Sequence, residues 1–196
     1  MARPVPAPRQ HLDPLERIVY AALGSGDHRV IELPDLLAAQ RFSPADGFGP
    51  IDAVRAHDDL FLRLAHDKAL QPALSAAARA LRPGGVLVAA VPEMDRLRRL
   101  RPTAPPPKVT VNGGRLEVTV QLWDWASDGD SYGLEIVRMF REHGRWEVAS
   151  TVSTQHRVLT GDELADRLRR AGFVQVNRLS PEQAGHPLPV WIALAP

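Results

Sequence analysis

The stretch ALSAAARALRPGGVLVAAVPE, residues 73–93, decides the fold predicted for this chain. Its first half belongs to a pattern over 67–81 that repeats leucine and alanine at helical spacing, which predicts a helix packed against a sheet. The Pro-Gly-Gly turn at 83–85 ends that helix. The run VLVAAV at 86–91 is apolar throughout, which is typical of a strand buried on both faces of a parallel sheet. With an upstream strand, these elements predict a βαβ unit and an α/β fold.

Shorter elements are predicted on the N-terminal side of this unit. Apolar residues recur at helical spacing over 12–23, behind an aspartate suited to capping, and predict a first helix. The runs HRVIEL at 28–33 and IDAVRA at 51–56 predict two strands. Residues 1–11 are rich in proline and lack apolar periodicity. We therefore expect a disordered tail there and one domain over 12–196.

An antiparallel layer is predicted after the parallel one. Apolar and polar residues alternate on both sides of Asn-Gly-Gly at 112–114, a strong hairpin signal because these residues accept positive φ. Two further segments, at 132–140 and 146–158, extend the hairpin to three or four strands. The layer is therefore expected as an insertion over 108–158.

The chain is expected to return to the first sheet after this insertion. Thr160 and Glu163 match a capping box, which predicts a helix that ends at Gly172. Apolar runs at 173–176 and 188–194 predict the last two strands.

The composition narrows the class of protein. The net charge is only +1 and there is no cysteine, so disulfides and thiolate chemistry are excluded and no nucleic-acid partner is expected. No apolar run approaches the roughly 20 residues that span a bilayer, so no membrane partner is expected either and we place the protein in the cytoplasm. Only Lys68 and Lys108 are lysines among 24 basic residues, which suggests a GC-rich bacterial genome.

Three linked segments carry a resemblance to a known family. FGPIDAVRAHDDLFLRL at 48–64, the stretch at 73–93 and HRVLTGDELADRLRRAGFVQV at 156–176 are similar in order and spacing to small-molecule class I S-adenosylmethionine-dependent methyltransferases. In that family the first segment is the fourth sheet strand with its site loop, and LRPGG precedes the fifth strand. The insertion with its tryptophans resembles the substrate-covering layer of glycine and sarcosine N-methyltransferases. The resemblance implies a Rossmann-like sheet with an inserted antiparallel layer.

The sequence departs from that family where the cofactor should bind. Cofactor binding there needs a glycine-rich turn after the first strand and an acid after the second. The Gly-Ser-Gly at 24–26 lies too close to the strand at 51–56 for the intervening elements. By spacing, 12–26 matches the family's second sheet helix and 30–36 its third strand. We therefore expect a truncated sheet without the N-terminal glycine-rich segment, and no binding or weak binding of S-adenosylmethionine.

Two positions match weak remnants of a cofactor site. Asp35 and Leu36 correspond to the place where relatives contact the adenine amino group. The alternative is that Asp35 makes an Asx turn after Pro34, and this reading is favoured because the ribose half is absent.

Polar residues at the carboxyl ends of predicted strands are candidate site residues, since ligands bind there in open α/β sheets. His57 and Asp58 follow the strand at 51–56 and are the candidate catalytic pair. Glu93 follows the strand at 86–91 and is a candidate substrate-binding residue. The alternative for the acids after His57 is simple capping of a short helix.

The insertion supplies the other candidate substrate-binding residues. Trp123, Trp125 and Tyr132 can wall an apolar pocket, although alternating aromatics are more often core. His156 and Arg157 match a pair that faces the substrate cavity in relatives, and arginine suits bidentate recognition of carboxylates. The alternative for Arg157 is an exposed position on an edge strand.

Two functions remain open at this stage. The first is a methyltransferase-family protein of small-molecule (specialised) metabolism that no longer methylates and acts as a pocket protein, an enzyme or a partner subunit. The second is an active S-adenosylmethionine-dependent methyltransferase completed by another chain. No metal-ligand spacing is present in the sequence. The exposed edge of a truncated sheet predicts a homodimer or a complex with a homologous methyltransferase, besides a small-molecule ligand.

Overall fold

The computed structural model describes residues 12–42 and 50–196, so the predicted tail over 1–11 lies outside the described part of the chain. The chain forms two compact units, which are described separately. The mixed-sheet unit contains the chain up to Asp58 together with 72–92 and 165–196. The antiparallel unit contains 59–71 and 93–164.

The mixed-sheet unit has a five-stranded sheet in the order β1-β2-β3-β9-β8. The first three strands pair in parallel, whereas β9 is antiparallel to both of its neighbours. The central strand β3 contains the continuous apolar run, and its residues from Val86 onward are buried as predicted. The bounds are β1 Val30–Glu32, β2 Ile51–Ala56, β3 Leu81–Ala90, β8 Val174–Leu179 and β9 Val190–Leu194.

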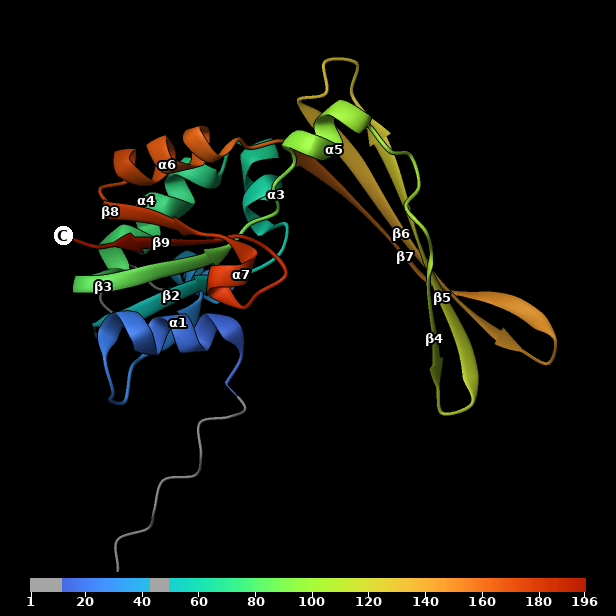
Figure 1. Ribbon diagram of the computed structural model, residues 1–196, viewed down its shortest axis with the longest axis horizontal. Helices are drawn as coiled ribbons and strands as arrows, with labels where there is room; N and C mark the ends of the chain where they lie inside the picture. Colours follow the sequence, from blue (N-terminus) through green and yellow to red (C-terminus); the bar gives the residue numbers. More distant parts are fainter. Residues whose placement is uncertain (1–11, 43–49) are drawn as a thin grey trace, which may run out of the picture. The chain divides into compact units, whose positions relative to one another are not determined.

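Helices cover both faces of this sheet (Figure 1). The first helix, α1, lies on one face, and α4 and α6 lie on the other. Asp13 caps α1 by accepting from the backbone N–H groups of Leu15 and Glu16, as predicted. The bounds are α1 Pro14–Leu23, α2 Leu33–Phe42, α4 Leu70–Ala80, α6 Gly161–Arg170 and α7 Pro181–Ala184.

The core of the mixed-sheet unit lies between α1 and the central strands. Leu15, Ile18 and Val19 of α1 pack against Val86 and Val88 of β3. All five side chains are at least nine-tenths buried. Burial of a leucine or isoleucine side chain contributes roughly 1.5–3 kcal/mol, so this contact anchors the helix.

The region after β1 differs from the sequence prediction in two ways. Helix α2 begins at Leu33, directly after the strand and within the segment 30–36 that was matched to a strand. Pro34 is tolerated there because the first helical turn needs no N–H donor. In addition, β1 pairs directly with β2, from Val30 opposite Ala53 to Glu32 opposite Arg55.

This pairing corrects the position assigned to β1. If β2 and β3 are the fourth and fifth strands of a doubly wound sheet, the strand beside β2 takes the place of the first strand in the order 3-2-1-4-5-6. The prediction that 30–36 forms the third strand is therefore wrong. Only α2 and residues 43–50 connect β1 to β2.

The antiparallel unit has a four-stranded sheet in the order β4-β5-β6-β7. All neighbours pair antiparallel, so the predicted meander is confirmed with four strands. Two short helices belong to the same unit, and α3 packs on β7. The bounds are β4 Lys108–Asn112, β5 Arg115–Trp125, β6 Ser131–Glu142, β7 Arg145–Arg157, α3 Leu60–His66 and α5 Asp95–Leu100.

Candidate functional site

Four of the predicted substrate-binding residues form one aromatic cluster in the antiparallel unit. The register places Trp125 opposite Tyr132, and Tyr132 opposite His156, on three adjacent strands. The ring centroids of Tyr132 and His156 are 4.7 Å apart, and the two ring planes are nearly parallel. Trp123 stacks on Tyr132 at 4.9 Å and on Trp125 at 5.7 Å. The alternating aromatic residues of the sequence therefore lie together in one cluster.

A carboxylate that was not among the predicted site residues completes this cluster. Oδ2 of Asp59 lies 2.7 Å from Nε2 of the fully buried His156. Asp59 precedes α3 at its N-cap position, but its side chain makes no capping hydrogen bond. Its other oxygen accepts from Nε of Arg63 at 3.0 Å. Asp59 thus links the helix to the strand that bears His156.

The pair has a defined electrostatic character. The hydrogen bond from His156, together with the charge of Arg63, holds the pKa of Asp59 below its ordinary value of 3.8. An ionised carboxylate can only accept hydrogen bonds. Nε2 of His156 therefore carries a proton and donates a hydrogen bond to Asp59. Burial raises the pKa of Tyr132 well above its ordinary value, and the negative charge of Asp59 adds to this effect.

Two buried polar atoms in the cluster lack a hydrogen-bond partner within the described residues. They are Nδ1 of His156 and Nε1 of Trp123. Buried polar groups are normally satisfied, so each such atom requires an explanation. In the neutral form of His156, with the proton on Nε2, the Nδ1 atom is an acceptor that suits a hydroxyl or amino group.

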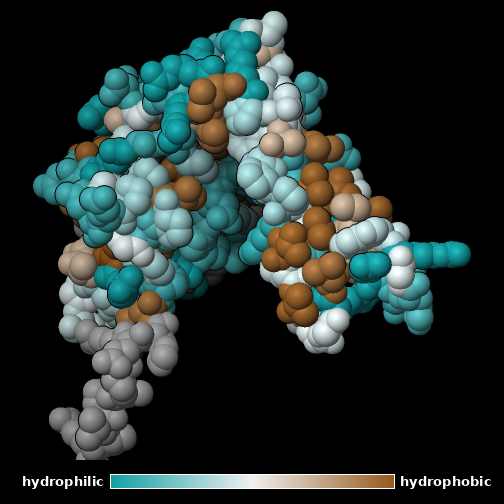
Figure 2. Space-filling model, turned by 45° about the vertical axis from the view of Figure 1, so that its right-hand side comes forward, coloured by the Kyte–Doolittle hydropathy of each residue, from teal (hydrophilic) through white to brown (hydrophobic). Residues whose placement is uncertain are grey.

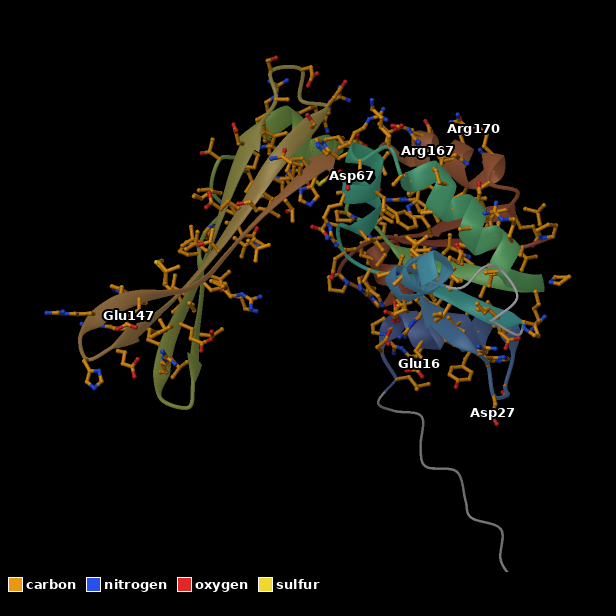
Figure 3. The ribbon with its side chains drawn as sticks, turned by 180° about the vertical axis from the view of Figure 1, so that it is seen from behind. Glu16, Asp27, Asp67, Glu147, Arg167 and Arg170 are labelled. Carbon is orange, nitrogen blue, oxygen red and sulfur yellow. The ribbon has the colours of Figure 1, made fainter. Side chains whose placement is uncertain are left out.

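A groove lies beside this pair, between α3 and β7. Its volume is about 410 Å³, which is within the range of small-molecule sites. Figure 3 shows one of its residues, Asp67, directly after helix α3. Five of its seven lining residues carry polar or charged groups; the lining consists of Leu60, Arg63, Leu64, His66, Asp67, Thr154 and Gln155.

Arg157 is engaged within the antiparallel unit. Its Nη2 lies 3.1 Å from Oε1 of Glu163, and its side chain is 44% exposed. Thr160 caps the following helix by accepting from the backbone N–H of Glu163, which confirms that part of the predicted capping box. A contact of Arg157 with a ligand carboxylate stays a prediction.

The predicted catalytic pair lies in the mixed-sheet unit. Nε2 of His57 is 3.2 Å from Oε2 of Glu32, across the carboxyl ends of β2 and β1. Asp58 is exposed and has a φ of 56°, a left-handed conformation that aspartate accepts more readily than most residues. Glu93 is exposed in the loop between β3 and α5, and belongs to the other unit. Convergence of these three residues stays a prediction.

Ion pairs fill the carboxyl ends of β1 and β2. Arg55 contacts Oε1 of Glu32 at 2.6 Å and Oδ2 of Asp13 at 2.8 Å. Burial alone would lower the pKa of Arg55, but the two carboxylates raise it above its ordinary value. Asp35 lies in the first turn of α2, beside a hollow of about 280 Å³ that Glu32 and Arg55 also line. Leu36 is completely buried, so its side chain belongs to the core.

A larger, open hollow beside α5 is lined by both signs of charge. Its volume is about 730 Å³, and its lining includes Arg98, Arg101 and Asp128. Arg98 pairs with Asp130, and Arg101 donates to the backbone oxygen of Ser127. These contacts engage both guanidinium groups within the unit, so the hollow is a weaker candidate site than the groove.

Two properties of the described part of the chain concern metal sites and membrane-spanning helices. Across residues 12–42 and 50–196, no three histidine, aspartate or glutamate side chains gather closely enough to hold a metal ion. No helix in these ranges is long and apolar enough to cross a membrane.

Comparison with known proteins places the fold. No family model matches the sequence, and no curated protein matches it significantly. The S-adenosylmethionine-bound CalS10, an amino pentose methyltransferase of calicheamicin biosynthesis from Micromonospora echinaspora, has a TM-score of 0.68 at 15% identity, covering 92% of this chain and 88% of its own. DesVI from Streptomyces venezuelae has a TM-score of 0.68 at 13% identity, with coverages of 93% and 91%.

A third solved structure agrees with these two. The sugar N-methyltransferase KedS8 from a Streptoalloteichus species has a TM-score of 0.64 at 16% identity, covering 91% of this chain and 83% of its own. Identities this low establish the fold and not the activity. The chain therefore has the Rossmann-like α/β fold of S-adenosylmethionine-dependent methyltransferases, with a second, antiparallel sheet, as the sequence predicted.

Proposed function

We propose that this chain is a small-molecule-binding protein of the methyltransferase family, from specialised metabolism, that binds S-adenosylmethionine weakly or not at all. In this proposal the antiparallel unit supplies the ligand site. The biosynthetic roles named for the structural neighbours support a place in specialised metabolism, and their amino-pentose and sugar substrates favour a sugar-sized polar ligand over glycine or sarcosine.

The start of α2 at Leu33 is the observation that carries the proposal. A glycine-rich turn lets the backbone approach a nucleoside cofactor after the first strand, but here β1 passes directly into a helix. Pro34 lacks an N–H donor, and Asp35 adds a negative charge to the first turn. The residues present do not fit the cofactor.

The ion pairs add a second reason. Glu32 ends β1, and it is already bound to Arg55 and close to His57. The short connection from β1 to β2 leaves no length for the strand that carries the ribose-binding acid in this type of fold. We infer that the lost cofactor segment lies between these two strands.

The ligand site is proposed beside the Asp59–His156 pair. The groove between α3 and β7 has the volume of a small-molecule site, and Arg63 connects its lining to Asp59. Thr154 and Gln155 add a hydroxyl and an amide, so a polar ligand with several hydroxyl or amino groups fits this lining.

Calorimetric titration with S-adenosylmethionine tests the central claim. We expect no saturable binding up to roughly millimolar cofactor, equivalent to less than about 4 kcal/mol of binding free energy. The Arg55→Ala variant serves as a matched test of the cause, because it removes the ion pairs but leaves α2 in place. It should gain no affinity if the backbone after β1 is the reason.

Two results would contradict the proposal. Micromolar affinity of the purified chain would show a working cofactor site. The same affinity appearing only in a complex with a second protein would favour the alternative, an active methyltransferase completed by another chain.

A further inference from the structure

The two faces of the four-stranded sheet differ in how far their apolar side chains are exposed. Side chains alternate between faces along each strand, and residues that pair across strands share a face. Val109 is opposite Val118, Val118 is opposite Met139, and Met139 is opposite Val148. This register defines what we call the apolar face, formed by Val109, Val111, Leu116, Val118, Val120, Leu122, Val137, Met139, Trp146 and Val148.

The other face also carries apolar side chains, but within the described residues of the sheet only Val152 of these is an exposed large hydrophobic residue. Ile136, Phe140 and Val152 lie there together with Leu134 and the aromatic cluster of Trp123, Trp125 and Tyr132. The guanidinium of Arg115 covers the ring of Phe140 at 3.3 Å. Charged, hydroxyl-bearing and amide side chains lie between them. These are Glu117, Thr119, Gln121, Arg138, Glu147 and Ser150.

Much of the apolar face is exposed. The exposed fractions are 71% for Val111, 62% for Val148, 57% for Val109, 49% for Trp146 and 43% for Leu122. Figure 2 shows hydrophobic side chains gathered along this part of the molecule. Monomeric proteins rarely expose a large contiguous apolar surface, and such surfaces mark interaction sites.

Charges at the two ends of the apolar face favour a second copy as the partner. Arg141 is exposed at one end, opposite Leu116 on one side and Trp146 on the other. Glu135 is exposed at the other end, opposite Leu122. A two-fold axis that lies between two stacked sheets and runs across their strands brings each Arg141 onto Glu135 of the second copy.

The size of the face is also sufficient. Four strands about 4.8 Å apart, over the length from Leu116 to Leu122 at about 3.4 Å per residue, give on the order of 500 Å² when side-chain width is added. Two copies then bury about 1,000 Å² together, which is the lower limit of a specific interface. By contrast, β1 offers a sheet edge of only three residues.

We propose that two copies of this chain form a homodimer by stacking their apolar faces, with Arg141 of each copy against Glu135 of the other. Stacked sheets pack about 10 Å apart with interleaved side chains, so the valines and Trp146 fill the space between them. This inference does not depend on whether the chain binds S-adenosylmethionine.

Sedimentation velocity over a range of protein concentrations tests the dimer. We expect a dimer in the unmodified chain, and at least about tenfold weaker association for Val111→Lys and for Val148→Lys, because each buries a charge in the interface. Both positions are exposed, so circular dichroism should show intact folding. Thr110→Lys, on the same strand as Val111 but on the other face, is the matched control and should leave the dimer unchanged.

A charge exchange tests the orientation. Arg141→Glu and Glu135→Arg should each weaken the dimer, and the double variant should restore most of the association. A monomer at all concentrations would overturn the proposal, as would a dimer that Val111→Lys and Val148→Lys leave intact. If the double variant fails to rescue the single ones, the two-fold pairing of Arg141 with Glu135 is wrong.

Discussion

Asp59 and His156 are 97 positions apart in the chain, yet their side chains meet at 2.7 Å. The contact joins the start of α3 to the end of β7, and Tyr132 stacks on the imidazole from the neighbouring strand. His156 is completely buried, and Asp59 supplies the hydrogen-bond partner of its Nε2. The pair therefore has a structural role as well as a place beside the groove.

Replacing Asp59 with asparagine should destabilise the antiparallel unit. The change removes the negative charge of the group that accepts hydrogen bonds from His156 and Arg63, while the size of the side chain is kept. A hydrogen bond to a charged group is worth about 1.5–3 kcal/mol, so we expect a loss of about 1.5 kcal/mol in the free energy of unfolding. Urea unfolding followed by tryptophan fluorescence measures it.

The adjacent aspartate provides the matched control. Asp58→Asn changes the same group one residue earlier, but this side chain is exposed and asparagine accepts its left-handed backbone conformation. We expect its effect to stay within about 0.5 kcal/mol. Equal losses for the two variants would show that the contact with His156 does not stabilise the fold.

The contribution of Asp59 should also depend on pH. Its pKa is lowered in the folded state, chiefly by the hydrogen bond from His156, so the stabilisation is complete above the ordinary value of 3.8 and is lost as the pH falls through the lower folded value. The difference in unfolding free energy between the unmodified chain and Asp59→Asn should therefore be large at about pH 6 and small at about pH 2. A difference independent of pH would contradict this assignment.

Local patterns predicted most of the elements because the side chains that define them are close in sequence. The apolar run in β3, the hairpin after β4 and the aspartate cap of α1 depend on neighbouring residues only. The alternation of Trp123 and Trp125 likewise indicated one shared face. The cluster with Tyr132 and His156 followed once the strands paired.

Features that depend on distant contacts were not predictable in the same way. The sequence His-Asp-Asp at 57–59 offers three polar residues after a strand, and no local signal distinguishes Asp59 from its neighbours. A distant strand makes that distinction, through His156. The position of β1 beside β2 is likewise a pairing over more than twenty residues. Helix α2 was missed because Pro34 and its neighbours resemble a loop.

The ion pair between Arg157 and Glu163 should contribute little to stability. Its atoms are 3.1 Å apart, but the arginine side chain is 44% exposed and water screens the attraction. A double-mutant cycle with Arg157→Ala and Glu163→Gln should give a coupling of about 0.2–1 kcal/mol that decreases with added salt. A coupling well above this range, unaffected by salt, would show that the pair is desolvated.

The two stacked tryptophans differ in one hydrogen bond, and this allows a paired substitution. Nε1 of Trp125 donates to the backbone oxygen of Pro102 at 2.9 Å, whereas Nε1 of Trp123 is buried without a partner among the described residues. Trp125→Phe should therefore cost about 1 kcal/mol more than Trp123→Phe, although both remove the same part of the ring.

Hydrogen exchange locates the effect of the tryptophan substitutions. The linker between α5 and β4, residues 102–107, is rich in proline. It is held to β5 by the hydrogen bond from Trp125 to Pro102 and by the bond from the backbone N–H of Trp123 to the oxygen of Thr103, at 2.7 Å. Loss of the first contact should loosen the linker, so the amide at position 123 should exchange faster in Trp125→Phe than in Trp123→Phe. If both variants lose the same stability and exchange alike, the size of the indole ring and not its hydrogen bond fixes the linker.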